Sequence, residues 1–311
     1  MTRGKILVTG ATGFVGKRIC RLLAARELAH ERTSLSLGVD LRDKAQAFEL
    51  FSRVRPEKVL HCAGFHGGIK FGLTYPADIF ANNMAMVANV FEAARISGVQ
   101  RIVNPISNCI YPKALNLFQE DKVWDGPMDE SVEVYAMVRK AAWIGAKAYG
   151  RQYGLETINL VISNMYGPGD HFEEERSHAL GALVMKFVEG KRRGASNVTV
   201  WGTGKPVREW IYVDDGAEAM IRALDCPETS DLINVGLAEG VSVLELAQRI
   251  KAIVGFEGEI VLDTSKPDGA PYKTVDGARG RALLGWSPSV RLEEGLQRTI
   301  DWYLGEQDGR A

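Results

Sequence analysis

Three evenly spaced glycines near the N-terminus could bind an anion. Gly10, Gly13 and Gly16 follow the apolar run 6–8 and precede an amphipathic stretch, which predicts a buried strand, a tight turn and a helix. In such a turn the first glycine lets the chain reverse, the second lets backbone N–H groups approach a pyrophosphate, and the third lets the helix pack against the strand. The helix N-terminus attracts phosphate charge. We therefore predict that a dinucleotide contacts Gly10, Thr12, Gly13, Phe14, Val15 and Gly16.

A phenol and a guanidinium one helical turn apart could transfer a proton. Tyr135 opens a predicted helix over 135–153, and Arg139 shares its face. Lys140, one residue further on, is turned away by about 100°. A nearby cation lowers the pKa of a phenol from its ordinary value of about 10 into a useful range. Ser107 ends a predicted strand, so its hydroxyl is expected to emerge at the cofactor edge of the sheet.

Strand and helix patterns alternate through the first half of the chain, which predicts an α/β fold with a doubly wound parallel sheet of the Rossmann type. Pro105 lacks an N–H and is expected at the end of its strand or at a bulge. Beyond Pro168 the rhythm changes. We predict a dinucleotide-binding domain over 1–168, to which 208–238 returns, and a smaller C-terminal α/β substrate domain over 169–311. Strands are expected at 34–39, 59–64, 101–107 and 157–162, a loop at 66–78, and short strands and turns at 208–215.

The composition argues against several classes of function. The 38 basic and 39 acidic side chains nearly cancel, so no net charge attracts nucleic acid or an anionic membrane. No apolar run approaches the roughly 20 residues of a membrane span, and no signal peptide precedes the first strand. The four cysteines form no C-x-x-C pair, which predicts a reduced, cytoplasmic protein. Mixed charges at Asp170, His171, 173–175 and His178 are typical of a solvated loop, and no metal site is predicted.

The residues that would choose between NAD and NADP give no clear answer. In dinucleotide folds a carboxylate at the end of the second strand binds the ribose hydroxyls, whereas an arginine there binds a 2′-phosphate. Neither stands clearly in place, and Asp40 and Leu41 are expected to border the adenine. At the end of the next strand, the small residues Ala63 and Gly64 suit close approach to the cofactor.

Taken in order, these segments resemble the extended short-chain dehydrogenase/reductase family, in particular its branch of GDP-L-fucose synthases, which are GDP-4-keto-6-deoxymannose epimerase/reductases. The G-x-x-G-x-x-G spacing is typical of that family, and the likeness covers nearly the whole chain. The matching segments are 67–69, 75–78, 107–112, 135–136, 151–154, 164–168, 177–178, 201–204, 208–209 and 266–269.

The resemblance implies NAD(P)-dependent epimerisation, 4-keto reduction or both, on a GDP-linked 4-keto-6-deoxy sugar or a close relative such as a GDP-heptose derivative. It slightly favours NADP(H) over NAD(H). It implies that Tyr135 gives a proton to the sugar carbonyl, that Ser107 orients this carbonyl, and that Cys109 and His178 form the acid/base pair for epimerisation. The family places lysine four residues after the tyrosine, and here Arg139 occupies that position. Guanidinium is bulkier and bonds differently, so we expect activity that is retained but altered.

The resemblance also implies a pocket for the nucleotide sugar, in which basic side chains bind the diphosphate and a tryptophan supports the base or ribose. Lys186 stands where the family usually has arginine, a change that loses bidentate recognition. The implied pocket residues are Asn164, Lys186, Trp201, Arg208, Asp268 and Lys273.

Two alternative functions and a homodimeric assembly are also considered. One rival is an NAD-dependent nucleotide-sugar 4-epimerase or 4-dehydrogenase. The other is a non-catalytic cofactor-binding protein, which Arg139 and Lys186 motivate. The helix over 79–97 is apolar on more than one face, and the family pairs this helix with the one over 135–153, so a homodimer is expected.

Overall fold

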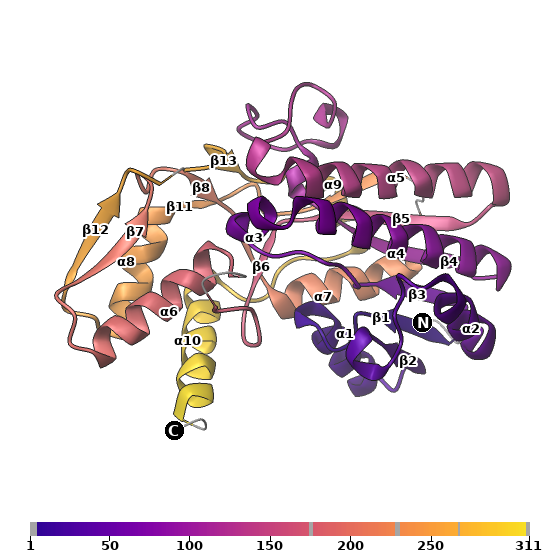
Figure 1. Ribbon diagram of the computed structural model, residues 1–311, viewed down its shortest axis with the longest axis horizontal. Helices are drawn as coiled ribbons and strands as arrows, with labels where there is room; N and C mark the ends of the chain where they lie inside the picture. The colour runs from indigo at the N-terminus through magenta and orange to yellow at the C-terminus, as the bar shows by residue number, and fades with distance from the viewer. Residues whose placement is uncertain (1–4, 174–176, 228–230, 267, 309–311) are drawn as a thin grey trace.

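Six parallel strands form the centre of the molecule (Figure 1). The computed structural model describes residues 5–173, 177–227, 231–266 and 268–308. The strand order is β10-β5-β4-β3-β1-β2, so the chain changes direction at β1 and leaves a crevice beside its carboxyl end. The predicted doubly wound α/β fold is confirmed. The strands are β1 (Ile6–Thr9), β2 (His30–Thr33), β3 (Lys58–His61), β4 (Arg101–Ser107), β5 (Glu156–Ile162) and β10 (Leu232–Val235).

Helices cover both faces of this sheet (Figure 1). On one face α1 packs against α7, and on the other α4 packs against both α2 and α5. Each face has its own apolar core, because the helices present one buried stripe toward the strands. Their bounds are α1 (Phe14–Ala25), α2 (Lys44–Val54), α3 (Ile69–Thr74), α4 (Pro76–Ile96), α5 (Glu133–Tyr153), α7 (Val213–Arg222) and α9 (Ala278–Leu284).

The second half of the chain builds a smaller layer beside the carboxyl end of the sheet (Figure 1). The parallel pair β7 and β12 carries α6, α8 and α10, and a separate apolar cluster lies between them. Short strands lead from this layer back toward the sheet. The elements are β6 (Asn164–Tyr166), α6 (Ala179–Arg192), β7 (Asn197–Trp201), β8 (Val207–Arg208), β9 (Trp210–Tyr212), β11 (Val241–Ser242), α8 (Val243–Val254), β12 (Glu259–Asp263), β13 (Tyr272–Lys273) and α10 (Leu292–Asp308).

Four expectations about local structure are wrong. The second strand is His30–Thr33, and residues 35–37 form a short 3₁₀ turn. The strand was misplaced because β2 is a polar edge strand without apolar alternation. The expected loop at 66–78 contains α3, and the expected strands and turns at 208–215 end in α7, which begins at Val213. Pro105 lies inside β4, but β3 pairs with β4 only as far as Val103, so no β3 partner needs its missing N–H.

Among the described helices, none combines the length and the hydropathy that a membrane span requires. The proposed domain limits at 168 and 208–238 stay a prediction, although β10 does join the central sheet as expected for 232–235.

Candidate active site

The glycine turn forms a cradle at the carboxyl ends of β1 and β3. Gly10 has a φ of +62°, and a methyl carbon placed on it would lie 2.7 Å from the backbone nitrogen of Ala63. Gly13 begins α1 without any side-chain cap, so the first-turn N–H groups of the helix are not blocked. Gly16 has no room for a side chain because the carbonyl of Gly10 lies against it. The turn therefore offers bare backbone N–H groups and a helix N-terminus to an anion.

Arg139 lies over the ring of Tyr135, as the helical spacing predicts. Its guanidinium carbon is 5.0 Å from the ring centroid, and the side chain is only 5% exposed. Its Nε makes no hydrogen bond within the described part of the chain. A methyl carbon placed on Gly64 would be 2.8 Å from the Arg139 Nη2 atom, so the guanidinium fills the space that a side chain there would need.

Lys140 takes no part in this arrangement. It donates a hydrogen bond to the carbonyl of Val123 at 2.8 Å, and its ammonium lies 4.2 Å from the ring centroid of Trp124. Burial lowers the pKa of Lys140. The one-residue step along α5 therefore sends the lysine to a different surface from Arg139.

Two side chains that follow β4 face the same edge of the sheet. Ser107 ends the strand, and its Oγ accepts a hydrogen bond from the backbone nitrogen of Cys109 at 3.2 Å. The ammonium of Lys273, on β13, lies 3.8 Å from Cys109 Sγ. The hydroxyl and the thiol are thus held two residues apart in a tight 3₁₀ turn.

His178 also lies within the electrostatic reach of Lys273. It stands at the N-terminus of α6 with its side chain accessible to solvent. Desolvation and the charge of the Lys273 ammonium both act to lower the pKa of His178. Lys273 thus contacts the Cys109 thiol, and its charge also acts on His178.

The candidate pocket for the nucleotide lies over β7. Trp201 is 42% exposed, so its ring is available to a ligand and is not part of the core. The ammonium groups of Lys186 and Lys266 lie 5.3 Å and 5.5 Å from its ring centroid. Lys186 also donates to the carbonyl of Thr199 at 3.0 Å. An exposed aromatic ring with two ammonium groups near it suits a base that carries phosphates.

Three further candidate pocket residues, Asp268, Arg208 and Asn164, form hydrogen bonds with other residues of the chain. The Asp268 carboxylate accepts hydrogen bonds from Thr203, at 2.7 Å from the backbone nitrogen and 2.8 Å from the hydroxyl. Arg208 donates to the carbonyl of Asp268 at 3.3 Å, and Asn164 donates to that of Glu209 at 2.9 Å. These contacts fix the loops around the pocket. Pro267, in the same matching segment as Asp268, lies outside the described residues.

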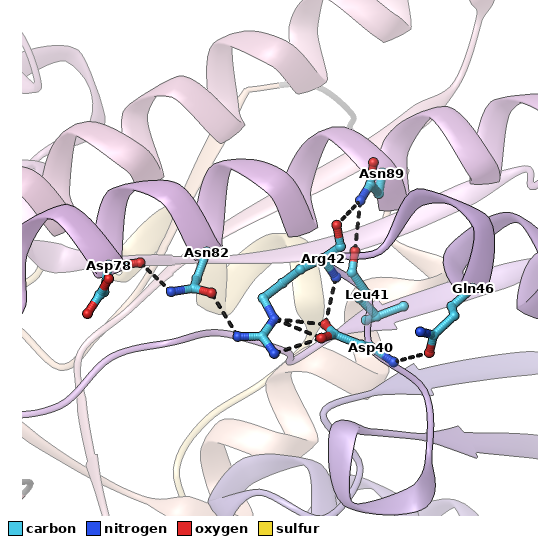
Figure 2. Close-up of polar contacts among 7 residues, drawn as sticks. All are labelled: Asp40, Leu41, Arg42, Gln46, Asp78, Asn82 and Asn89. Carbon is cyan, nitrogen blue, oxygen red and sulfur yellow. Dashed lines mark hydrogen bonds and ion pairs between the residues drawn. The ribbon is translucent and has the colours of Figure 1, made fainter.

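Asp40 forms an ion pair with Arg42 in the segment between β2 and α2 (Figure 2). Arg42 donates from Nη2 and Nε to its carboxylate at 2.6 to 3.0 Å, and from Nη1 to Asn82 at 2.8 Å. The Arg42 guanidinium lowers the pKa of Asp40, so the carboxylate stays ionised and paired. Leu41 is buried, and its carbonyl accepts from Asn89.

The comparison with known families decides the classification. Residues 6–236 match the NAD dependent epimerase/dehydratase family. The chain belongs to that family. GDP-L-fucose synthase 1 of Arabidopsis thaliana is 38% identical over 301 residues, which cover 96% of this chain and 93% of that protein. The predicted resemblance to GDP-L-fucose synthases is therefore confirmed.

Solved structures agree with this assignment. A GDP-6-OMe-4-keto-L-xylo-heptose reductase from Campylobacter jejuni superposes with a TM-score of 0.91 at 26% identity and covers 98% of this chain and 99% of that one. A GDP-L-fucose synthetase from Naegleria fowleri bound to NADP gives a TM-score of 0.88 at 27% identity and covers 99% and 95%. The central sheet and the smaller layer of this epimerase are therefore both present in its relatives.

The residues of this epimerase fit a nicotinamide dinucleotide, the cofactor class of its family. Gly10 and Gly16 leave room only for backbone, α1 presents an uncapped N-terminus, and the orphaned Arg139 Nε needs an acceptor. Among the described residues no three His, Cys, Asp or Glu side chains gather as a metal site would require. Glu174 and Glu175 lie outside the described residues.

The sequence did not single out two residues that organise this site. Glu209 is fully buried, and its carboxylate accepts from the backbone nitrogens of Leu237 and Val275 at 2.8 and 2.9 Å. Glu209 thereby connects the segment between β8 and β9 to the loops that contain Leu237 and Val275. The ring of His66 packs 5.4 Å from that of Tyr135. Only the position of Glu209 beside Arg208 in a matching segment could have signalled its importance.

Proposed function

We propose that the chain is an NAD(P)H-dependent enzyme that epimerises and then reduces a GDP-linked 4-keto-6-deoxyhexose. The observation that carries this proposal is the Cys109 thiol beside the Lys273 ammonium, two residues beyond Ser107 at the end of β4. A reductase alone would need neither a thiol nor an imidazole there. The names of the relatives, which are GDP-L-fucose synthases and a GDP-keto-heptose reductase, support the same substrate class.

Each side chain has a role in the proposed reaction. Cys109 and His178 remove a proton from a carbon next to the ketone and return one to the other face. Ser107 donates a hydrogen bond to the ketone oxygen, and Tyr135 gives that oxygen a proton. When bound, a reduced nicotinamide cofactor would supply the hydride. Once Tyr135 has donated its proton, its side chain is a phenolate, and the positive charge of Arg139 stabilises it.

The nucleotide is held by the second half of the chain. Trp201 supports the guanine or its ribose, and Lys186, Arg208 and Lys273 bind the diphosphate. Asp268 acts through Thr203, whose turn it fixes. For the hydride donor we propose NADPH, which the relative solved with NADP supports.

The assembly is proposed to be a homodimer in the cytoplasm. Helices α4 and α5 lie side by side and expose Phe80, Met137 and Ile144, which a second copy would cover. All four cysteines are free, which suits a reducing compartment. Light scattering on the purified protein tests the dimer, and the mass of a monomer would refute it.

The test of the function uses GDP-4-keto-6-deoxymannose and NADPH in deuterated water. We expect cofactor oxidation at 340 nm, and NMR should detect solvent deuterium at the carbons next to the ketone. Deuterium without cofactor oxidation would indicate an epimerase only, and retained NAD without net NADPH use would favour the 4-epimerase. Cofactor binding with neither reaction, in the wild type and in Arg139→Lys, would favour the non-catalytic protein.

A further inference from the structure

Glu209, between β8 and β9, carries a carboxylate that is buried against backbone groups. Its Oε1 atom accepts from the backbone nitrogen of Leu237 at 2.8 Å, and its Oε2 atom accepts from that of Val275 at 2.9 Å. Burial raises the pKa of Glu209 to about 7, although these N–H donors oppose the shift. Among the described residues, no lysine or arginine bonds to this carboxylate. A buried charge without a cationic partner is costly, so a role for it is worth seeking.

Glu209 holds the strand that carries Lys273 through both its main chain and its side chain. The backbone nitrogen of Glu209 donates to the carbonyl of Lys273 at 3.1 Å, and the carboxylate accepts from Val275, two residues further on. The opposite edge of this segment bonds to Phe118, whose backbone nitrogen donates to the carbonyl of Thr274 at 2.9 Å. The position of Lys273 therefore depends on Glu209 at one edge and on the Phe118 loop at the other.

Lys273 extends this placement to the Cys109 thiol. Its ammonium lies 3.8 Å from Cys109 Sγ, and the cysteine is free and partly exposed. The thiolate, not the thiol, is the reactive form of cysteine, and an adjacent cation favours it. A shift of β13 would move the ammonium away from the sulfur and lower the reactivity of Cys109.

We infer that Glu209 is a positioning residue that holds the Lys273 ammonium beside the Cys109 thiol and thereby sets the reactivity of that thiol. Glutamine at this position would offer one acceptor oxygen, and its NH₂ group would face a backbone N–H. One of the bonds to Leu237 and Val275 would be lost, and the segment around Lys273 would move. The inference rests on the proposed function only for the use of Cys109 in epimerisation.

Alkylation of Cys109 by iodoacetamide tests the inference on the full chain, without cofactor or sugar. Peptide mass spectrometry distinguishes Cys109 from the buried Cys20 and Cys226 and from Cys62, whose pKa burial raises to about 12. At about pH 8, where Glu209 is ionised, Lys273→Met should slow the reaction of Cys109 by about tenfold. Glu209→Gln should slow it by about three- to tenfold.

The double variant shows whether Glu209 acts through Lys273. Once Lys273→Met has removed the cation, Glu209→Gln should cost less than about twofold in the alkylation rate. An equal cost of Glu209→Gln with and without Lys273 would overturn the inference. The same cycle with Glu209→Asp, which keeps the charge but shortens the side chain, gives the same test if Glu209→Gln fails to fold.

Asp215 provides the matched control for a loss of stability alone. This carboxylate of α7 is also buried, and it accepts from the backbone nitrogens of Ser289 and Val290 at 2.9 and 3.0 Å. Asp215→Asn should lower the melting temperature but leave the alkylation rate of Cys109 unchanged. If Asp215→Asn slows that rate as much as Glu209→Gln does, the effect reflects stability, and the inference is wrong.

A second measurement separates this inference from the proposed function. With the GDP-sugar in deuterated water, Glu209→Gln should slow deuterium incorporation by the same factor as alkylation, while calorimetry should find NADPH affinity within about twofold of the wild type. Alkylation that depends on Glu209 as described, with no turnover of the sugar, would refute the function and support the inference. Turnover with alkylation that is indifferent to Glu209 would do the reverse.

Discussion

The two ends of the cofactor crevice recognise their ligand by opposite physical means. At the nicotinamide end a single buried cation, Arg139, is pressed between Tyr135 and the bare backbone of Gly64. At the adenosine end the Thr12, Ser34 and Ser36 hydroxyls bond to one another, and Asp40 and Arg42 form an ion pair. A positive charge therefore lies beside Tyr135, the proposed proton donor, whereas the charges of Asp40 and Arg42 cancel at the proposed adenosine end.

This difference follows from the cost of burying charge. A guanidinium with an orphaned Nε is costly to bury, and such groups are retained when a ligand or a reaction uses them. Hydroxyls are cheap to bury because they satisfy one another. The proposed chemistry should consequently be sensitive to small changes at the nicotinamide end and tolerant of them at the adenosine end.

The largest effect is expected from Tyr135→Phe. Removing the phenol removes the proposed proton donor, so reduction should slow by about 10² to 10⁴-fold, while NADPH binding should stay within about twofold. Turnover at 340 nm and calorimetry on the same preparation check both values. Tyr153→Phe, at an exposed tyrosine on the same helix, is the matched control. Equal activity of the two variants would remove Tyr135 from the mechanism.

The next effect tests the fit between Gly64 and Arg139. Gly64→Ala places a methyl carbon 2.8 Å from Arg139 Nη2, so the guanidinium must move, and kcat/KM should fall by about 10 to 100-fold. In an Arg139→Lys background the shorter side chain leaves that space free, and Gly64→Ala should cost less than about threefold. Gly145→Ala, on the same helix with open space around it, should be harmless in both backgrounds.

A strictly additive pair would contradict this prediction, because the two sites would then act independently. Separation of kcat from KM and the pH profile of each variant would show whether the moved cation alters the titration of Tyr135 or only the stability of the fold.

His61 should make the same end of the crevice sensitive to acid. It is buried beside Thr9, and desolvation together with the Arg139 charge lowers its pKa to about 3. The unfolded chain binds a proton near pH 6.5 and the folded chain does not, so stability is full above pH 6.5 and falls as the pH decreases toward 3. Between pH 6.5 and 5 the loss from this residue should be about 2 kcal/mol.

Urea unfolding at those two pH values measures this contribution. His61→Asn keeps a polar partner for Thr9 but cannot titrate, so its stability should change less with pH than that of the wild type. His30→Asn, at a partly exposed histidine of β2, should leave the pH dependence as it is. If the free energy of unfolding of His61→Asn changes with pH as much as that of the wild type, a protonated His61 is tolerated beside Arg139.

Local sequence patterns predicted the parts of this site that lie within one element. The glycine turn and the shared face of Tyr135 and Arg139 depend on the geometry of a single turn and a single helix, so spacing was sufficient. The second strand was misplaced because β2, at the edge of the sheet, is polar and lacks the apolar alternation that marks a strand. Helix α7 was missed although Asp214 and Asp215 in its first turn are an N-terminal signal.

Contacts between distant segments could not be predicted in this way. Gly64 and Arg139 are 75 positions apart, and nothing in either segment alone reveals that one makes room for the other. The same holds for the buried Glu209, whose partners Leu237 and Val275 follow it at long range. The contact of Thr12 with Ser34 depends on the true end of β2, so the error in that strand also hid this contact.

The smallest effect is expected where the adenosine end is neutralised, at the Asp40–Arg42 pair. Arg42→Ala removes the ion-pair partner of the Asp40 carboxylate (Figure 2). At contact distance in water the repulsion between this carboxylate and a 2′-phosphate is worth about 1 kcal/mol at most, so NADPH should bind roughly threefold more weakly and NADH less than twofold. Salt should remove the difference, because the pair is partly exposed.

Asn82→Ala is the matched control for that experiment. It removes the other partner of Arg42 but leaves the bidentate pair with Asp40 intact, so both affinities should stay as they are. A similar loss in both variants would point to altered packing of α4 against the adenosine end. If Arg42→Ala instead leaves the ratio of the two affinities unchanged, Asp40 does not reach the 2′ position of a bound cofactor.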